Sequence, residues 1–405
     1  MEPSALQKFD PQEFVDKQVM EIRRVVGSER ALIAVSGGVD STTCAVLTHR
    51  ALGQNLLCVM LDDAFMRAGE PVRVSQLLSQ PPLNLPIRIL RVEQRFLKAL
   101  KGLRDAEEKR RAFRETFYKS LSEAAEKEGF RFLVQGTIQA DIVETVGGIK
   151  TQHNILSQVG ISPTEYYGFQ VIEPLATIYK GQVRQVARFL GIPSGISERQ
   201  PFPGPGLSVR VVGEVRVDKL ESLKEATTVT EETLAEHKPK QYFAAIIDNV
   251  EASEHPRLSH VWETATRFLK IPSERVSVKV FRDRATGIKG GGRHYGEIVA
   301  VKAQMANGSL LQPPISSLVA LQTEILRENP SFTRVLYAVR EARQGQPYVV
   351  AIRAIETYNF LTAKVSDIPW TTLRKAAQKI FQACSDVSRV YYDVTPKPPA
   401  TIEME

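Results

Sequence analysis

The sequence predicts an α/β protein: a doubly wound parallel sheet followed by an α+β domain that contains a duplicated strand–helix–strand unit. Three observations predict this. Short apolar runs alternate with helical segments through the first half of the chain. A proline- and glycine-rich connector, RQPFPGPGLSVRVVGE, follows at 199–214. The last third then repeats a pattern, since EIVAVKAQ at 297–304 matches YVVAIRAI at 348–355.

The first domain opens with ALIAV at 31–35, a short apolar run typical of a buried strand. The polar stretch SGGVDSTT interrupts it, and a helical pattern then runs to Gly53, a residue suited to end a helix. Three more strand-like runs and one long charged helix follow, at 55–63, 87–92, 104–129 (the helix) and 131–137. Because strands and helices alternate, we expect ligands at the carboxyl edge of a parallel sheet.

The second domain begins with a charged segment at 218–270, which we expect to be helical with a break at DNVEASEHP. Beyond it, FTRVLYAV at 332–339 matches VSRVYYDV at 387–394, and an amphipathic helical segment precedes each of them. We therefore predict two strand–helix–strand units, at about 280–345 and 346–405, related by a pseudo-twofold axis. The predicted domains are 1–212 and 213–405.

Composition excludes several classes of protein. The 405 residues carry a net charge of +7, which suits an anionic partner, but no run of basic and aromatic residues predicts a nucleic-acid surface. No apolar stretch is long enough for a membrane span, and the start has no signal-peptide pattern. The three cysteines, Cys44, Cys58 and Cys384, are far apart and exclude a disulfide framework. We expect a reducing, cytoplasmic location.

The strongest local motif is Ser36-Gly37-Gly38-Val39-Asp40-Ser41, between a strand and a helix. The glycines allow close backbone approach to an anion, and the amides at the start of the helix point toward it. An aspartate in such a loop suggests a bridging cation, so we expect Mg²⁺ at Asp40. The sequence has neither a Walker A motif nor the GxGxxG fingerprint of dinucleotide-binding folds.

This motif resembles the pyrophosphate-binding loop of N-type ATP pyrophosphatases, which cleave ATP between the α- and β-phosphates. Three further segments resemble the GMP synthase family within that group. They are the connector RQPFPGPGL, the lid region GTIQADIVE…GGIKTQHN at 136–154, and the closing motif KPPATIEME at 397–405. The resemblance covers the chain from about residue 15 to its last residue.

The resemblance implies roles for individual residues. Ser36, Gly37, Gly38, Val39, Asp40, Ser41, Asp62 and Gly136 would bind ATP, with Asp40 at Mg²⁺. Lys150 and His153 would belong to the lid that closes over the reacting phosphate, beside the acids Asp141 and Glu144. Xanthosine monophosphate (XMP) would be bound by Arg199, Arg293, Lys397, Ile402 and Glu403. Without the motif context, Arg293 would be interpreted as a solvated residue, His153 as an ordinary loop histidine, and the tail as a frayed terminus.

The sequence departs from the family pattern at several positions. Gln152 replaces the first of two adjacent lid histidines, and Gln139-Ala140 replaces a Tyr-Pro pair. Gly291 stands where an acid is usual, and Met404 where an aromatic residue is usual. These departures bear on recognition of the purine more than on ATP activation.

The function that the resemblance implies is amination of XMP to GMP by a ligase that uses MgATP and ammonia, through an adenylyl-XMP intermediate. No amidotransferase domain is evident, so ammonia would come from solution or from a separate glutaminase subunit in trans. We expect no nucleic-acid or membrane partner, and either a homodimer or a monomeric pseudo-dimer. The alternatives are another adenylating pyrophosphatase, acting on a different nucleotide or tRNA, and a catalytically weak nucleotide-binding sensor.

Overall fold

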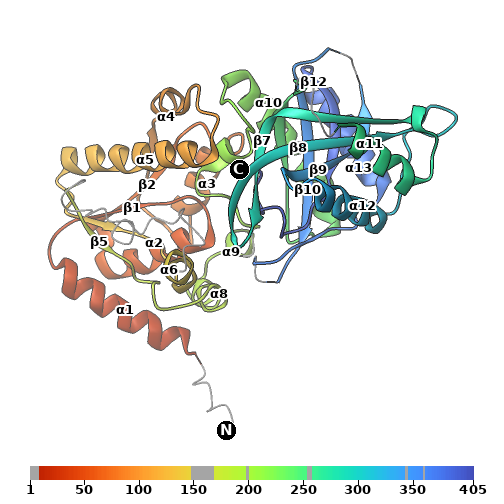
Figure 1. The fold of residues 1–405 in the computed structure, drawn as a ribbon. Coiled ribbons are helices and arrows are strands. Elements are labelled where there is room, and N and C mark those ends of the chain that lie inside the picture. The colour runs from red at the N-terminus through yellow and green to blue at the C-terminus, as the bar shows by residue number, and fades with distance from the viewer. Residues whose placement is uncertain (1–8, 147–167, 198–199, 253–257, 343–344, 359–360) are drawn as a thin grey trace, which may run out of the picture. The chain divides into compact units, whose positions relative to one another are not determined.

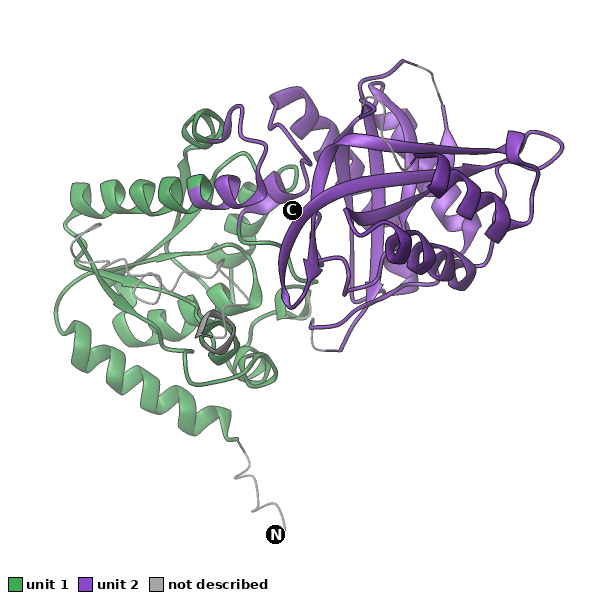
Figure 2. Ribbon diagram, viewed as in Figure 1, with its two compact units in different colours: residues 1–99, 112–204 green, residues 100–111, 205–405 purple. Residues whose placement is uncertain are grey.

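The computed structural model describes residues 9–146, 168–197, 200–252, 258–342, 345–358 and 361–405. The chain divides into two compact units, which Figure 2 distinguishes by colour. Unit 1 comprises 1–99 and 112–204, and unit 2 comprises 100–111 and 205–405. The predicted domain boundary at residue 212 stays a prediction, because a compact unit need not fold independently.

Unit 1 is built on a parallel five-stranded sheet whose strand order is β3-β2-β1-β4-β5. Its strands are β1 (Ala31–Ala34), β2 (Leu56–Asp62), β3 (Ile87–Arg91), β4 (Phe132–Val134) and β5 (Gln170–Ile172). The order reverses between β1 and β4, which makes their carboxyl ends the topological switch point of the sheet. The predicted doubly wound parallel fold is confirmed.

Helices flank this sheet on both sides, as Figure 1 shows for α1 and α2 on one side and α5 on the other. α2 is buried around most of its circumference, so it is the central helix of the core. The helices described in this part of the chain are α1 (Pro11–Val26), α2 (Val39–Leu52), α3 (Glu70–Ser79), α4 (Glu93–Leu100), α5 (Ala106–Glu128), α6 (Gln139–Val146), α8 (Lys180–Phe189) and α9 (Ser194–Ser197).

Unit 2 contains a mixed seven-stranded sheet in the order β11-β10-β12-β9-β8-β7, with β6 also paired to β10. The strands are β6 (Gln241–Asp248), β7 (Val276–Lys289), β8 (Gly292–Ala303), β9 (Phe332–Glu341), β10 (Tyr348–Glu356), β11 (Lys364–Val365) and β12 (Val387–Asp393). Four α-helices accompany them in the described part of the chain: α10 (Val217–Leu234), α11 (Leu258–Leu269), α12 (Ile315–Glu328) and α13 (Trp370–Ala383).

The predicted duplication is confirmed by strand register. β8-α12-β9 and β10-α13-β12 are both strand–helix–strand units with parallel strands. Ile298 is paired with Arg334 in the first unit, and Val349 is paired with Arg389 at the equivalent position of the second. Each register shifts just before this pair, and β9 meets β12 antiparallel at the centre of the sheet. The units therefore face each other as a pseudo-dimer within one chain, while the oligomeric state stays a prediction.

One expectation for unit 2 is wrong. The segment 218–270 was expected to be helical apart from one break, but β6 lies within it. Its apolar core, Phe243–Ile247, is fully buried, and β6 pairs antiparallel with β10 along eight residues. A short apolar run buried on both faces has no alternating pattern that distinguishes strand from helix, so tertiary pairing decided the outcome.

Three buried charges lie where the two repeat units meet the tail of the chain. The Asp393 carboxylate accepts hydrogen bonds from Arg334 Nη1 at 3.0 Å and from Arg353 Nη1 at 2.8 Å. All three side chains are fully buried. The arginines also bind tail carbonyls, Arg353 Nε donating to Ile402 O at 2.8 Å and Arg334 Nη2 to Glu403 O. The two arginines thus hold the tail in place through its backbone carbonyls.

Replacing Asp393 with asparagine should leave two buried guanidinium groups without a counter-charge. We expect Asp393→Asn to lower the free energy of unfolding by about 3 kcal/mol or more, as for other broken buried ion pairs. Urea unfolding monitored by circular dichroism measures this change. Glu324→Gln, which breaks an exposed pair with Arg327, is the matched control and should leave the midpoint almost unchanged. Equal, small effects of both variants would contradict the expectation.

Candidate functional site

The Ser36–Ser41 loop connects β1 to α2 at the switch point of the unit 1 sheet. Its two serine hydroxyls lie 3.0 Å apart, and Ser41 Oγ also accepts from Ser36 N and donates to Gly38 O. Gly38 is the N-cap of α2, and no side chain of a described residue caps the helix there. The first amides of a 14-residue helix therefore remain available to an anion, as the loop sequence predicted.

Two glycines allow the loop its close packing. Gly37 has φ +74°, and a Cβ there would lie 2.8 Å from a Val74 methyl group. Gly136, just after β4, lies against the first turn of α2, where a Cβ would be 3.0 Å from Ser41 N and from the Asp40 carbonyl carbon. The structure thus brings Gly136 together with the loop residues, and its role in ATP binding stays a prediction.

Asp40 shows how the loop would accept a cation. Its Oδ2 is ion-paired with Lys180 Nζ, whereas its Oδ1 is buried and accepts no hydrogen bond from the described residues. An unsatisfied carboxylate oxygen beside an anion-binding loop fits a Mg²⁺ ligand, since Mg²⁺ bound with phosphates needs one or two carboxylates. No cluster of three or more potential metal-ligating side chains occurs among the described residues, so Asp40 stays a prediction as the metal ligand.

Lys180 lies at the candidate site through its ion pair with Asp40, and sequence reasoning missed it. It is the first residue of α8, where a positive charge opposes the helix dipole. That unfavourable position is compensated by the Asp40 contact, which holds the ammonium at the edge of the anion-binding loop. The sequence did offer one signal for this residue, a lysine at the start of the helix that follows the last parallel strand.

The carboxyl end of β2 carries two acids. The resemblance implied Asp62, whose half-buried side chain ends the strand. Its neighbour Asp63 is buried, accepts from Phe65 N at 2.8 Å, and precedes Ala64 at φ +73°. Burial raises the pKa of the Asp63 carboxyl to about 7. Positive φ is uncommon for alanine, so the loop after β2 holds a strained backbone beside a weakly acidic carboxyl.

The tail residues of unit 2 are ordered rather than frayed. Lys397 forms a two-way backbone bridge with Ala363, and Thr286 N donates to Met404 O at 2.8 Å. The Met404 side chain is fully buried in the core with Phe281 and Tyr391. The methionine therefore fills, as an apolar side chain, the position at which the family usually has an aromatic residue. Glu403 accepts from Arg210 and Gln241. Lys397, Ile402 and Glu403 therefore belong to one ordered segment.

Arg293 and Gly291 lie at the turn between β7 and β8. Gly291 has φ +80°, a conformation that glycine adopts without strain, which accounts for the missing acid in structural terms. Arg293 follows the turn and is ion-paired with Glu107 of unit 2. Arg293 is therefore not simply solvated, because its guanidinium is paired with a carboxylate. Whether it binds substrate stays a prediction.

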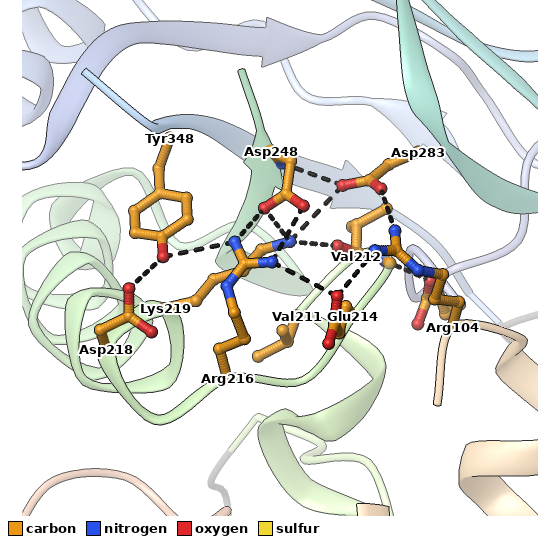
Figure 3. A network of polar contacts seen from close by, with 12 residues as sticks. Arg104, Val211, Val212, Glu214, Arg216, Asp218, Lys219, Asp248, Asp283 and Tyr348 are labelled. Carbon is orange, nitrogen blue, oxygen red and sulfur yellow. Dashed lines mark hydrogen bonds and ion pairs between the residues drawn. The ribbon is translucent and has the colours of Figure 1, made fainter. Parts of the chain in front are cut away.

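A buried polar network fixes the segment that follows the connector (Figure 3). Lys219 Nζ donates to Val212 O and lies 2.8 Å from Asp248 Oδ1. Asp248 also pairs with Arg216 at 2.6 Å. Burial works to raise the pKa of Asp248, but the Arg216 hydrogen bonds and the Lys219 charge outweigh it and lower that pKa. Asp283 accepts from Asp248 N, which closes the network.

Several predicted residues lie outside the described residues: Lys150, Gln152, His153 and Arg199. Asp141 is described, and its Oδ2 accepts from Ile138 N at 3.0 Å at the start of α6. That contact is the one made by an acid at the third helical position of a capping box. Its hydrogen bond gives Asp141 a structural role beside the implied one, and the backbone of Glu144 lies in the same helix.

The cysteines are buried, as expected. Cys44 and Cys58 are fully inaccessible, and burial raises the pKa of the Cys58 thiol to about 12. Thiols that stay protonated at neutral pH are poor nucleophiles, so packing explains them. None of the helices in the described part of the chain has the length and apolar character that a membrane span requires.

The fold and the loop together define the class of protein: an N-type ATP pyrophosphatase fold followed by a mixed-sheet unit. The family model described as NAD synthase matches residues 11–259, and that of the GMP synthase C terminal domain matches residues 338–404. A GMP synthase (glutamine-hydrolyzing) subunit of Sulfurisphaera tokodaii is 41% identical, covering 98% of this chain and 100% of the relative. The chain belongs to this family of GMP synthase subunits.

A second relative supports the same assignment. The corresponding GMP synthase (glutamine-hydrolyzing) subunit of Methanopyrus kandleri is 38% identical over 98% of this chain and 100% of its own length. Among solved structures, NMN synthetase from Francisella tularensis is similar to 49% of this chain and 79% of its own, with 17% identity and a TM-score of 0.38. The family confirms the predicted enzyme class, a ligase that forms a C–N bond.

A methyl group at residue 136 should displace the first turn of α2, which we expect to bind the nucleotide. We expect Gly136→Ala to raise the dissociation constant for MgATP about tenfold, because small displacements of positioning groups have large effects on binding. Isothermal titration calorimetry measures it. Gly195→Ala, where a Cβ meets nothing within 4 Å, is the control and should bind MgATP like the wild type. Unchanged affinity in Gly136→Ala would contradict the assignment of Gly136.

The raised pKa of Asp63 should appear in the pH dependence of stability. Because the folded carboxyl holds its proton to about pH 7 and the unfolded one loses it near pH 4, stability falls as pH rises through that window. Asp63→Asn cannot titrate, so its stability relative to the wild type should rise on the order of 2 kcal/mol between pH 5 and pH 8.

Urea midpoints at the two pH values measure this difference. Asp16→Asn, the same acid-to-amide change at an exposed position of α1, is the matched control and should not reproduce this rise. A difference for Asp63→Asn that does not change with pH would show that this carboxyl ionises normally in the folded state.

Proposed function

We propose that this chain aminates XMP to GMP, consuming MgATP and ammonia and releasing AMP and pyrophosphate. The observation that carries the proposal is the anion-binding loop at the switch point, with Asp40 and Lys180 at its edge, in a chain related over its whole length to subunits of GMP synthase. Residues of the ordered tail would bind the purine nucleotide.

In the first step, the XMP O2 attacks the α-phosphorus of ATP and the bond to the bridging oxygen of the β-phosphate breaks. The pyrophosphate leaves into the loop of Ser36–Ser41, whose hydroxyls and helix amides stabilise its charge. Lys180 brings a second positive group to that edge of the loop. Mg²⁺ held by Asp40 would neutralise phosphate charge. The lid residues Lys150 and His153 are proposed to close over the reacting phosphate.

In the second step, ammonia attacks C2 of the adenylylated purine. The C2–O bond breaks, AMP leaves with the oxygen, and the nitrogen loses a proton to give GMP. No protein side chain forms a covalent bond, so the chain acts by positioning, charge neutralisation and exclusion of water. Arg199, Arg293, Lys397, Ile402 and Glu403 are proposed to hold XMP for both steps.

Ammonia is proposed to come from a separate glutaminase subunit. The relatives named above are called subunits of a glutamine-hydrolyzing enzyme, which supports a partner chain that carries the glutamine chemistry. Cys44, Cys58 and Cys384 are all buried, and a buried protonated thiol is unsuited to that chemistry.

Turnover with free ammonia tests the proposal directly. Purified chain with MgATP, XMP and excess ammonium chloride should give GMP, AMP and pyrophosphate in equal amounts, measured by chromatography. Asp40→Asn should lower the rate by about a hundredfold or more, because it removes the carboxylate proposed to hold Mg²⁺. Asp16→Asn, on the exposed face of α1, should turn over like the wild type.

Other outcomes separate the competing functions. Pyrophosphate release with another nucleotide or a tRNA, and none with XMP, would favour a different adenylating pyrophosphatase. Tight ATP binding without any turnover would favour a nucleotide sensor.

A further inference from the structure

Arg210 of unit 2 joins the connector to the tail through a side-chain ion pair. Its Nε donates to Glu403 Oε2 at 2.8 Å and its Nη2 donates to Glu403 Oε1 at 3.0 Å, a bidentate arrangement. The Arg210 carbonyl accepts from Ile246 N at 2.9 Å, so β6 fixes the backbone from which this side chain extends. Two parallel charge-assisted hydrogen bonds define both the position and the plane of the carboxylate.

The guanidinium is almost completely buried, at 1% exposure. It lies over the ring of Phe243, with 4.0 Å between the guanidinium carbon and the ring centroid. Burying a charge is unfavourable unless it is paired, and hydrophobic replacements of buried ion pairs are often as stable. Stability alone therefore does not account for an arginine here, whereas orientation of the carboxylate does.

The backbone of the tail does not depend on Arg210. Arg334 binds Glu403 O and Arg353 binds Ile402 O, and Met404 is anchored in the core. These contacts hold the peptide groups on both sides of the Glu403 side chain. The contribution of Arg210 is thereby confined to the carboxylate, which separates its role from that of the other buried arginines.

The carboxylate keeps capacity for one more partner. A carboxylate has about four acceptor positions, and Arg210 together with Gln241 Nε2 fills three of them. Among the described residues Oε2 accepts only from Arg210 Nε, and the Glu403 side chain is 15% exposed. An ionised carboxylate only accepts hydrogen bonds, so it selects a ligand that presents an N–H or O–H group there.

We propose that Arg210 is a positioning residue that fixes the Glu403 carboxylate in one orientation, to accept a hydrogen bond from a ring N–H of the substrate purine. This inference rests on the proposed function, in which Glu403 binds XMP. A purine that presents a ring nitrogen lone pair at that place, as adenine does at N1, is disfavoured because two acceptors then face each other.

Arg210→Lys tests the role because it keeps the charge and removes the bidentate geometry. With ammonia as nitrogen donor, the KM for XMP should rise about tenfold or more, while the KM for ATP stays within about twofold of the wild type. Calorimetric titration with XMP alone should show the same loss of affinity. Arg216→Lys is the matched control, since Arg216 pairs with Asp248 in the same unit and no hydrogen bond or ion pair with the tail is found for it in the described part of the chain.

Four results decide whether Arg210 positions Glu403 for XMP. A rise in the KM for XMP in Arg210→Lys and not in Arg216→Lys supports the proposal. Equal rises in both variants overturn it, because the effect is then general destabilisation. If Glu403→Gln raises the KM for XMP and Arg210→Lys does not, Arg210 has no positioning role and the proposed function stands. If Glu403→Gln has no effect, the XMP assignment of Glu403 fails first.

A second variant covers the case in which Arg210→Lys does not fold. Phe243→Leu removes the aromatic face on which the guanidinium lies and keeps the ion pair. We expect a smaller rise in the KM for XMP, about threefold, with an unchanged KM for ATP. A Phe243→Leu enzyme with wild-type kinetics would overturn the inference in that case.

Discussion

The Asp393 carboxylate neutralises two fully buried guanidinium groups, those of Arg334 and Arg353, and the order of the tail depends on this arrangement. Each arginine also donates to tail atoms, so removal of the shared charge would disturb both the ion pairs and the tail contacts. Glu403 can present a fixed carboxylate only because its own peptide groups are already held. The proposed purine site is therefore a consequence of a charge buried beneath it.

In unit 1, the charge of the Ser36–Ser41 loop is balanced by the ion pair of Asp40 with Lys180. This loop is proposed to bind phosphates, yet it contains the acid Asp40. Lys180 at the start of α8 balances that acid, and the amides at the start of α2 supply the remaining positive potential. Close packing of Gly37 against Val74, and of Gly136 against the first turn of α2, fixes where these amides point. The balance leaves Asp40 Oδ1 as an acceptor ready for a cation, which is why a single acid within an anion-binding loop is consistent with MgATP.

Much of the fold and part of the site were predictable from sequence, for identifiable reasons. The strand before Ser36 and the helix ending at Gly53 are local features, since apolar length and a glycine cap determine them. The matched arginines Arg334 and Arg389 predicted the duplication, and the structure places them at equivalent register positions of the two units. β6, Lys180 and Arg210 were missed because their roles come from partners distant in sequence: β10, Asp40 and Glu403. Local pattern carries no information about such pairings.

Unit 2 contains two charge clusters at strand ends, and only one of them is fully buried. Lys302 of β8 and Arg389 of β12 surround Glu341 at the end of β9, as Arg353 of β10 and Arg334 of β9 surround Asp393 at the end of β12. The Glu341 cluster is partly exposed, whereas the Asp393 cluster is fully buried. The tail accounts for this difference, because its carbonyls occupy the donors of Arg334 and Arg353. The basic residues of the two clusters correspond in the repeat, whereas Asp393 aligns with Ala338, so the acid of the buried cluster that supports the proposed purine site comes from the second unit alone.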